Sequence, residues 1–148
     1  MRVDVVHQEK YWYPDDGGIV WVAGFHLVDE RRGFVGREAA AERGLIVTAV
    51  AGAGRHHAEA LPSVELGQPL TLRRDPGNPH DPNAIAVHAG EQVGWVPRDL
   101  AIDVAADLDA GRPWSALALR EQRASPREPR TGITMLLAPE PVLTLHVR

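Results

Sequence analysis

A short, proline-rich stretch of the chain holds side chains whose types allow ligand chemistry. It reads Arg73-Arg74-Asp75-Pro76-Gly77-Asn78-Pro79-His80-Asp81-Pro82-Asn83-Ala84-Ile85. The amide of Asn78, the imidazole of His80 and the carboxylate of Asp81 can all make hydrogen bonds, so together they suit a small polar ligand. Histidine and carboxylate are also ordinary metal ligands, so the same set can indicate a metal-dependent hydrolase.

The backbone of this stretch is expected to be stiff. Asp75-Pro76-Gly77-Asn78 has proline second and glycine third, the pattern of a type II turn, whose third residue takes a positive φ. Pro79 and Pro82 fix φ twice more and restrict the residues that precede them. A rigid loop that displays polar side chains at the rim of a barrel is a common position for a binding site. The alternative is that the Asn and Asp side chains only hydrogen-bond the backbone of the turn.

Signatures of catalysis and metal binding are missing from the sequence. The side chains that could be imagined around a metal are His56, His57, His80 and Asp81. No metal-binding spacing such as HExxH occurs, and there is no cysteine. No serine has the context of a nucleophile elbow, and the Gly52-Ala53-Gly54 cluster matches no phosphate-binding loop. We therefore expect no catalytic residue, metal or other cofactor, and a His/Asp metal-dependent hydrolase remains an alternative.

Short apolar runs separated by proline and glycine predict a mainly β protein. Aromatic and β-branched residues at 10–13 and 19–22 flank Pro14-Asp15-Asp16-Gly17-Gly18 and predict a hairpin with a five-residue loop. The aromatic residues of this hairpin either pack across the two strands or form a platform for base stacking. The other strand candidates are 3–6, 45–50, 69–74, 84–88, 92–96, 114–120, 134–137 and 142–147.

Two helices are expected among these strands. Residues 37–43 are strong helix formers, and Gly44 is a natural stop. The clearer helix follows Pro97, because apolar residues between positions 100 and 108 recur on one face. Gly111 then ends it. Seven or eight short strands with one good helix predict a small closed or half-closed β-barrel.

Length and charge set further limits. At 148 residues the chain suits one domain, which buries roughly 70% of the surface of the unfolded chain. The formal net charge is −4, and residues 50–111 are the most acidic part. A general nucleic-acid binder usually has a basic surface over the whole domain, so only a small pocket for one or two phosphates is compatible with this charge. No membrane span or secretory signal is apparent, and a soluble, cytoplasmic protein is expected.

Three segments of the chain resemble the HIRAN domain family. They are Val50-Ala51-Gly52 leading to Arg55-His56, residues 72–87 (LRRDPGNPHDPNAIAV), and residues 93–101 (VGWVPRDLA). The family pattern is a Gly-containing strand followed by Arg and an aromatic, an REP-NP-D-NAI-V core, and GY-P running into a helix. The resemblance extends over roughly residues 45–147. It implies an OB-like or SH3-like β-barrel with one or two helices that holds the 3′ end of single-stranded DNA in a pocket.

The resemblance also implies which residues would bind DNA. Carried over position by position, they are Arg55, His56, Asn78, His80, Asp81, Trp95 and Arg98. Histidine stands at positions 56 and 80, where the family often has an aromatic such as tyrosine, so stacking should be weaker. Residues 1–44 have no counterpart in the minimal domain. We expect them to form an N-terminal extension, a hairpin plus a short helix, packed on the HIRAN-like domain of residues 45–148.

Physical chemistry gives reasons for an end-specific pocket. A carboxylate such as Asp81 can accept a hydrogen bond from a 3′-hydroxyl, and the amide of Asn78 can also bond it, whereas a 3′-phosphate would face like charge. Arg98 lies beside the start of the expected helix, whose free N–H groups form an anion site. The acidic balance of the surrounding residues predicts modest affinity.

A protein–protein module is the alternative function. In that case the same groove, or the hairpin with Tyr11-Trp12-Tyr13, docks a second copy or another protein. Since family members occur fused to Swi/Snf-type ATPases and nucleases, a DNA-repair ATPase or nuclease is one possible partner. Four arginines spaced near Ser125-Pro126 predict a basic hairpin loop, either solvated or following a DNA backbone. These are Arg120, Arg123, Arg127 and Arg130.

Overall fold

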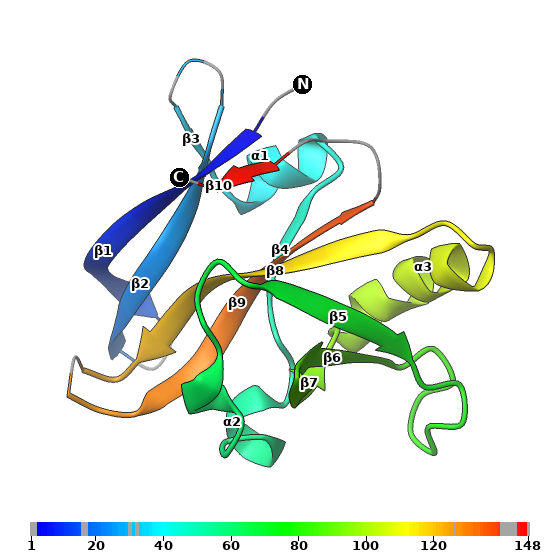
Figure 1. Cartoon of the computed structure of the whole chain (residues 1–148). Coiled ribbons are helices and arrows are strands. Elements are labelled where there is room, and N and C mark those ends of the chain that lie inside the picture. The colour runs from blue at the N-terminus through cyan, green and yellow to red at the C-terminus, as the bar shows by residue number, and fades with distance from the viewer. Residues whose placement is uncertain are drawn as a thin grey trace.

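The computed structural model describes residues 3–15, 18–29, 31, 33–125, 127–139 and 145–147, with only the backbone path at 3–15, 18–22, 54, 55 and 145–147. Strands dominate the chain (Figure 1). They are β1 (Val3–Asp15), β2 (Gly18–Val28), β3 (Phe34–Val35), β4 (Ile46–Ala49), β5 (Pro69–Arg74), β6 (Ile85–Ala89), β7 (Glu91–Trp95), β8 (Trp114–Arg123), β9 (Arg130–Pro139) and β10 (Leu145–Val147). The helices are α1 (Arg37–Glu42), α2 (Ala53–His56) and α3 (Arg98–Asp109), with a 3-10 turn η1 (Leu61–Ser63).

The strands form a mainly antiparallel sheet that does not close. Its main path runs β10-β1-β2-β8-β5-β6-β7, while β9 pairs with both β8 and β4, and β3 pairs with β2. Just after β4, Ala51 and Trp95 exchange two backbone hydrogen bonds of 2.8 and 2.9 Å, which bring this segment against β7. The expectation of a small, mainly β, OB-like fold is thus confirmed. The expected helix at 37–43 and the helix after Pro97 correspond to α1 and α3, whereas α2 was not expected.

Two apolar cores lie on opposite faces of β8 and β9. Ala118, Met135 and Leu137 face the larger core, which α3 and strands β5 to β7 enclose. Leu119 and Leu136 face the smaller core under α1 and β2. Residues 133–138 of β9 are all buried, and all but Thr134 are apolar, because a strand covered on both sides has no polar positions to alternate with. Within the described ranges, no helix is long and apolar enough to cross a membrane.

The N-terminal hairpin joins this sheet at its β8 edge. β1 and β2 pair up to Asp15 and Gly18, so two residues separate the strands and the expected five-residue loop is too long. Trp21 pairs with Arg123 and Gly24 with Arg120, so β2 continues the sheet of β8. The side chains of Tyr11-Trp12-Tyr13 lie outside the described residues. The division of the chain at residue 44 remains a prediction.

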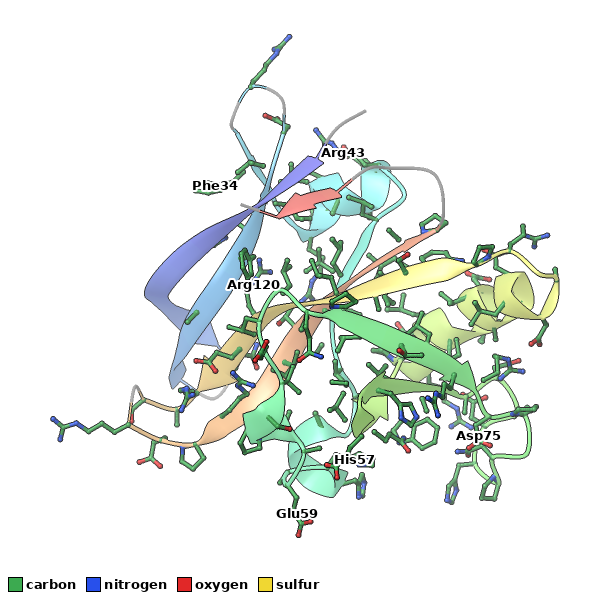
Figure 2. The ribbon with its side chains drawn as sticks, in the orientation of Figure 1. Phe34, Arg43, His57, Glu59, Asp75 and Arg120 are labelled. Carbon is green, nitrogen blue, oxygen red and sulfur yellow. The ribbon has the colours of Figure 1, made fainter. Side chains whose placement is uncertain are left out.

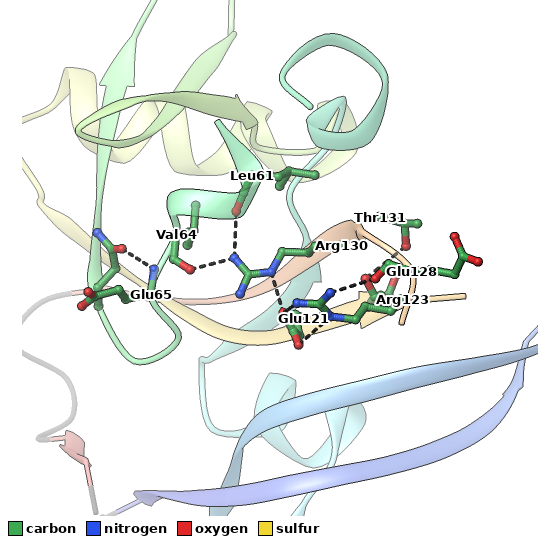
Figure 3. Close-up of polar contacts among 10 residues, drawn as sticks. Leu61, Val64, Glu65, Glu121, Arg123, Glu128, Arg130 and Thr131 are labelled. Atoms are coloured by element: carbon green, nitrogen blue, oxygen red, sulfur yellow. Dashed lines mark hydrogen bonds and ion pairs between the residues drawn. The ribbon is translucent and has the colours of Figure 1, made fainter. Parts of the chain in front are cut away.

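The expectation of a basic loop at 120–130 is wrong for three of its four arginines. Arg120 and Arg123 lie in β8 and Arg130 begins β9. Glu121 is almost buried and accepts hydrogen bonds from Arg123 at 3.0 Å and Arg130 at 2.6 Å (Figure 3). Burial alone would raise the pKa of Glu121, but the two guanidinium groups outweigh it and hold this pKa below its usual value.

The same arginine ties η1 to the hairpin of β8 and β9. Arg130 Nη1 donates to the carbonyl oxygens of Leu61 at 2.8 Å and Val64 at 2.7 Å (Figure 3). Leu61 is the first residue of η1 and Val64 follows its last, so the guanidinium holds both ends of the turn; the Leu61 carbonyl also accepts the backbone N–H of Val64 at 3.2 Å. Arg130 therefore has a structural role, and Arg127 alone of the four lies in the exposed turn between the strands.

Candidate nucleic-acid interface

A single cavity brings together three separate parts of the chain. It has a volume of about 440 Å³, within the range of ligand pockets. Its lining comes from the segment around α2, from the loop between β5 and β6, and from the junction of β7 with α3. Figure 2 labels His57 at the end of α2 and Asp75 at the start of this loop. The lining residues are Ala51, His56, Asn78, His80, Asp81, Ala84, Trp95, Val96 and Arg98.

Six of the seven residues expected to bind DNA line this cavity. The seventh, Arg55, belongs to α2, but its side chain is outside the described residues. The apolar lining at Ala51, Ala84 and Val96 was not expected, because these residues lie near strand ends and carry no chemical signature in the sequence. Among the side chains described, no group of three or more His, Cys, Asp or Glu is arranged to hold a metal ion.

Asn78 builds the loop that forms one wall. The backbone N–H of Asn78 donates to Asp75 O at 3.1 Å and closes the expected turn. Gly77 is not at positive φ, however, so the turn is not of type II. The side-chain oxygen of Asn78 accepts from the backbone N–H of His80 at 2.8 Å and of Asp81 at 3.1 Å. This amide oxygen, rather than a positive φ, sets the direction of the chain after the turn.

Asp81 serves both the loop and the cavity. One carboxylate oxygen, Oδ1, accepts from the backbone N–H of Asn83 at 2.9 Å, and the side chain is only 16% exposed. The other oxygen, Oδ2, lies 3.8 Å from Nε of Arg98. Both interpretations of the loop therefore apply, because the same residues stabilise the turn and line the cavity. Asp81 Oδ2 is the acceptor that is left for a ligand.

Arg74, the last residue of β5, holds the loop by hydrogen bonds to its backbone. It donates to the carbonyl oxygens of Ala84 at 2.8 Å and Pro82 at 3.1 Å, and binds the carboxylate of Asp109 with two hydrogen bonds. The bond to Asp109 raises the pKa of Arg74 further above its already high value. A guanidinium suits this position since it can donate to several acceptors in fixed directions. Its place at the end of a strand gave no sequence signal for this role.

The imidazole of His56 and the indole of Trp95 flank Gly52. A Cβ added at Gly52 would lie 3.4 Å from His56 Cδ2 and 3.6 Å from Trp95 Cδ1. Gly52 itself has φ +73°, a conformation that glycine adopts without cost and that starts α2. The two rings are thus placed on the same side of the cavity as the α2 segment. Flat rings in this position can stack on a nucleobase.

Arg98 lines the cavity at the start of α3. Its guanidinium donates to the carbonyl oxygen of His80, while its side chain remains 73% exposed. It is also the first residue of α3, where the N–H groups of Leu100 and Ala101 already donate to Pro97 O. The N–H groups of Arg98 and Asp99, at the start of this turn, have no acceptor one turn earlier, so they and the guanidinium favour an anion here.

The part of the chain that forms the cavity matches a known protein family. Residues 44–116 match the HIRAN domain model. This segment belongs to the HIRAN domain family. It runs from Gly44, two residues after the end of α1, to the first residues of β8, and it contains every residue that lines the cavity. The HIRAN domain is a DNA-binding domain.

Two crystal structures are similar to part of the chain. The HIRAN domain of human HLTF is 24% identical, with 64% of this chain and 75% of that chain covered and a TM-score of 0.47. A protein from Lactobacillus plantarum is 20% identical, with 62% and 89% covered and a TM-score of 0.48. No curated protein matches the chain.

Proposed function

We propose that this HIRAN domain binds single-stranded DNA at a free 3′ end and does so without catalysis. The observation that carries the proposal is the convergence of α2, the β5–β6 loop and the start of α3 on one cavity of about 440 Å³. Each group needed for a nucleotide end is present there. The rings of His56 and Trp95 suit a base, Asp81 suits a hydroxyl, and Arg98 suits a phosphate.

The terminal hydroxyl has a specific acceptor in this proposal. Asp81 Oδ2 makes no hydrogen bond within the loop, in contrast to Oδ1, and its contact with Arg98 is long at 3.8 Å. One N–H of the Asn78 amide donates to Asp75 at 3.2 Å, which leaves its second hydrogen for the ligand. The amide oxygen of Asn78 is already shared by two backbone N–H groups, so Asn78 acts as a donor.

The other lining residues would contact the base and the adjoining phosphate. Stacking of one base on an aromatic side chain contributes about 1–3 kcal/mol. Arg98 is mostly exposed, so its guanidinium can turn from the His80 carbonyl toward a backbone phosphate beside the first turn of α3. Because the surrounding segment is acidic, the affinity should be modest and should depend on the pocket rather than on a basic surface.

Fluorescence anisotropy with a short labelled single strand tests the proposal. Trp95→Ala should weaken binding by about tenfold, in line with the loss of one stacked base. Arg127→Ala removes one exposed positive charge from the turn between β8 and β9, and should change the affinity little. Equal losses in the two variants, or no binding by the wild-type protein at millimolar concentration, would reject the pocket.

A further inference from the structure

Arg73 is an exposed arginine without a carboxylate partner among the described side chains. Five other arginines in or near the sheet and α3 contact a carboxylate. Those within ion-pair distance of a carboxylate are Arg74, Arg98, Arg112, Arg123 and Arg130. In a chain of net charge −4, an exposed guanidinium on the strand that leads into the cavity-lining loop is available to an external anion.

The strand register places Arg73 in one row with Trp95. Arg73 is opposite Ala86 on β6, and Ala86 is opposite Trp95 on β7. Residues directly opposite each other in an antiparallel pair share a face of the sheet. The neighbouring pair, Leu72 and Val87, belongs to the core face. Arg73, Ala86 and Trp95 therefore form a row on the face opposite the core, in which Ala86 is 6% exposed between the two longer side chains.

The length of this row fits a short piece of a DNA strand. Two strand spacings separate Trp95 from Arg73, which amounts to about 10 Å. Phosphates on one strand follow each other at about 3.4 Å along a stacked helix, and at larger steps when the strand is extended. A strand whose last base stacks at Trp95 can thus bring a phosphate about one to three nucleotides upstream to Arg73.

Charge favours this path over a path along α3 or one past α2. The second residue of α3, directly after Arg98, is Asp99, whose carboxylate is exposed. Past α2 the loop presents the exposed carboxylate of Glu59, which projects outward in Figure 2. A polyanion avoids both routes because like charges repel. The outer face of β5 and β6 presents Arg73 instead.

We propose that Arg73 binds a backbone phosphate upstream of the captured 3′ end, so that the DNA strand leaves the cavity across β6 toward β5. This inference rests on the proposed function, because it assumes that a DNA end occupies the cavity. It adds a second contact that lies outside the cavity and gives the domain a minimum strand length. The polarity also follows, since the 5′ part of the strand lies over β5.

The test is an oligonucleotide of eight nucleotides in which one phosphate at a time is replaced by a neutral methylphosphonate, starting from the 3′ end. Affinity is measured for the wild-type protein, for Arg73→Ala and for Arg37→Ala. Arg37 is an exposed arginine on α1 and serves as a control of equal charge change. Thermal unfolding should be the same for all three proteins, because neither arginine makes an ion pair among the described residues.

We expect Arg73→Ala to weaken binding of the unmodified strand by about threefold to tenfold. One replacement, one to three linkages from the end, should weaken binding to the wild type and to Arg37→Ala but not to Arg73→Ala. If every replacement acts alike on the three proteins while binding still requires a 3′-hydroxyl, the path over β5 is wrong and the pocket stands. If the wild type shows no preference for a 3′ end, the proposed function itself fails.

Discussion

Arg74 and Asp109 are joined by two hydrogen bonds, from Nε to Oδ1 at 2.9 Å and from Nη2 to Oδ2 at 3.1 Å. The pair links the end of β5 to the end of α3. Since the same guanidinium also holds the carbonyl oxygens of Pro82 and Ala84, it connects the cavity-forming loop to the helix that begins on the other side of the cavity. The shape of the cavity thus depends on a contact outside it.

Asp109→Asn should loosen the loop with little effect on global stability. The carboxylate is solvent-exposed, and exposed ion pairs contribute little to the free energy of unfolding. We expect an affinity for 3′-ended DNA that is lower by about twofold to threefold, and an almost unchanged urea midpoint. Asp103→Asn, an exposed carboxylate on the same helix with no ion pair among the described residues, is the control. An equal effect of both substitutions would show that charge alone is responsible.

The pH range of this contact follows from the sign of the shift. The hydrogen bond from Arg74 lowers the pKa of Asp109 below its ordinary value of 3.8. The contact is therefore complete above that value and is lost as the pH falls through the lowered pKa. Between pH 5 and pH 8 the difference between wild type and Asp109→Asn should stay constant.

Asp81→Asn should reduce the discrimination between end groups. Asparagine keeps the oxygen that accepts from the N–H of Asn83, so the loop retains its turn. The negative charge that opposes a 3′-phosphate is removed. We expect the ratio of the affinities for 3′-hydroxyl and 3′-phosphate strands to fall by about fivefold or more. A ratio that stays the same in Asp81→Asn would show that Asp81 does not contact the end.

Gly94→Ala should separate β7 from the segment after β4. A Cβ at this position would lie 2.5 Å from Ala51 O, which belongs to the bridge between Ala51 and Trp95. The backbone must shift, at a cost of about 1–3 kcal/mol in the free energy of unfolding. Gly77→Ala is the control, because nothing lies within 4 Å of its added Cβ and its φ is not positive. Urea denaturation of both variants provides the measurement.

Glu121→Gln should destabilise the protein in a pH-dependent manner. It removes the charge that compensates the nearly buried guanidinium of Arg130, a loss of about 3 kcal/mol for a buried pair. Since the pKa of Glu121 is below its ordinary 4.5, its contribution is present above that pH and disappears as the pH falls through the lowered pKa. The difference in unfolding free energy should therefore be large at pH 7 and shrink below pH 4.5.

The matched control for this variant is Glu128→Gln in the same hairpin. The side chain of Glu128 is exposed, and its backbone carbonyl, which accepts from Arg123, is kept in the variant. We expect almost no change in stability at either pH. If both variants lose the same free energy, or if the loss in Glu121→Gln does not depend on pH, the network around Glu121 does not contribute as the structure indicates.

Local sequence patterns were sufficient to predict most strands and six residues that line the cavity, but not the contacts that support it. The proline-rich loop was recognisable because Asn78 and Asp81 are residues that organise turns and can also bind ligands. The turn type was wrong, because the bonds of the Asn78 oxygen to two N–H groups compete with the simple Pro-Gly rule. The role of Arg74 depends on Asp109, thirty-five positions away, and no local pattern carries such a pairing.

The arginines of the β8–β9 hairpin also show that local sequence patterns do not reveal distant partners. Four arginines near proline and serine resemble a basic loop when only neighbouring residues are considered. In the structure, Glu121 lies between Arg123 and Arg130, and the carbonyl groups of a distant 3-10 turn complete the set. Which carboxylate or carbonyl group an arginine contacts depends on the register of β8 and β9, which the sequence does not reveal.

The most direct test of the account compares three labelled strands of the same sequence in one anisotropy experiment: one with a 3′-hydroxyl, one with a 3′-phosphate and one that is circular. The cavity accepts an end and places Asp81 against it, so we predict clear binding of the 3′-hydroxyl strand and much weaker binding of the other two. Equal, salt-sensitive binding of all three strands would contradict the account, because it would show attraction to the DNA backbone without recognition of an end.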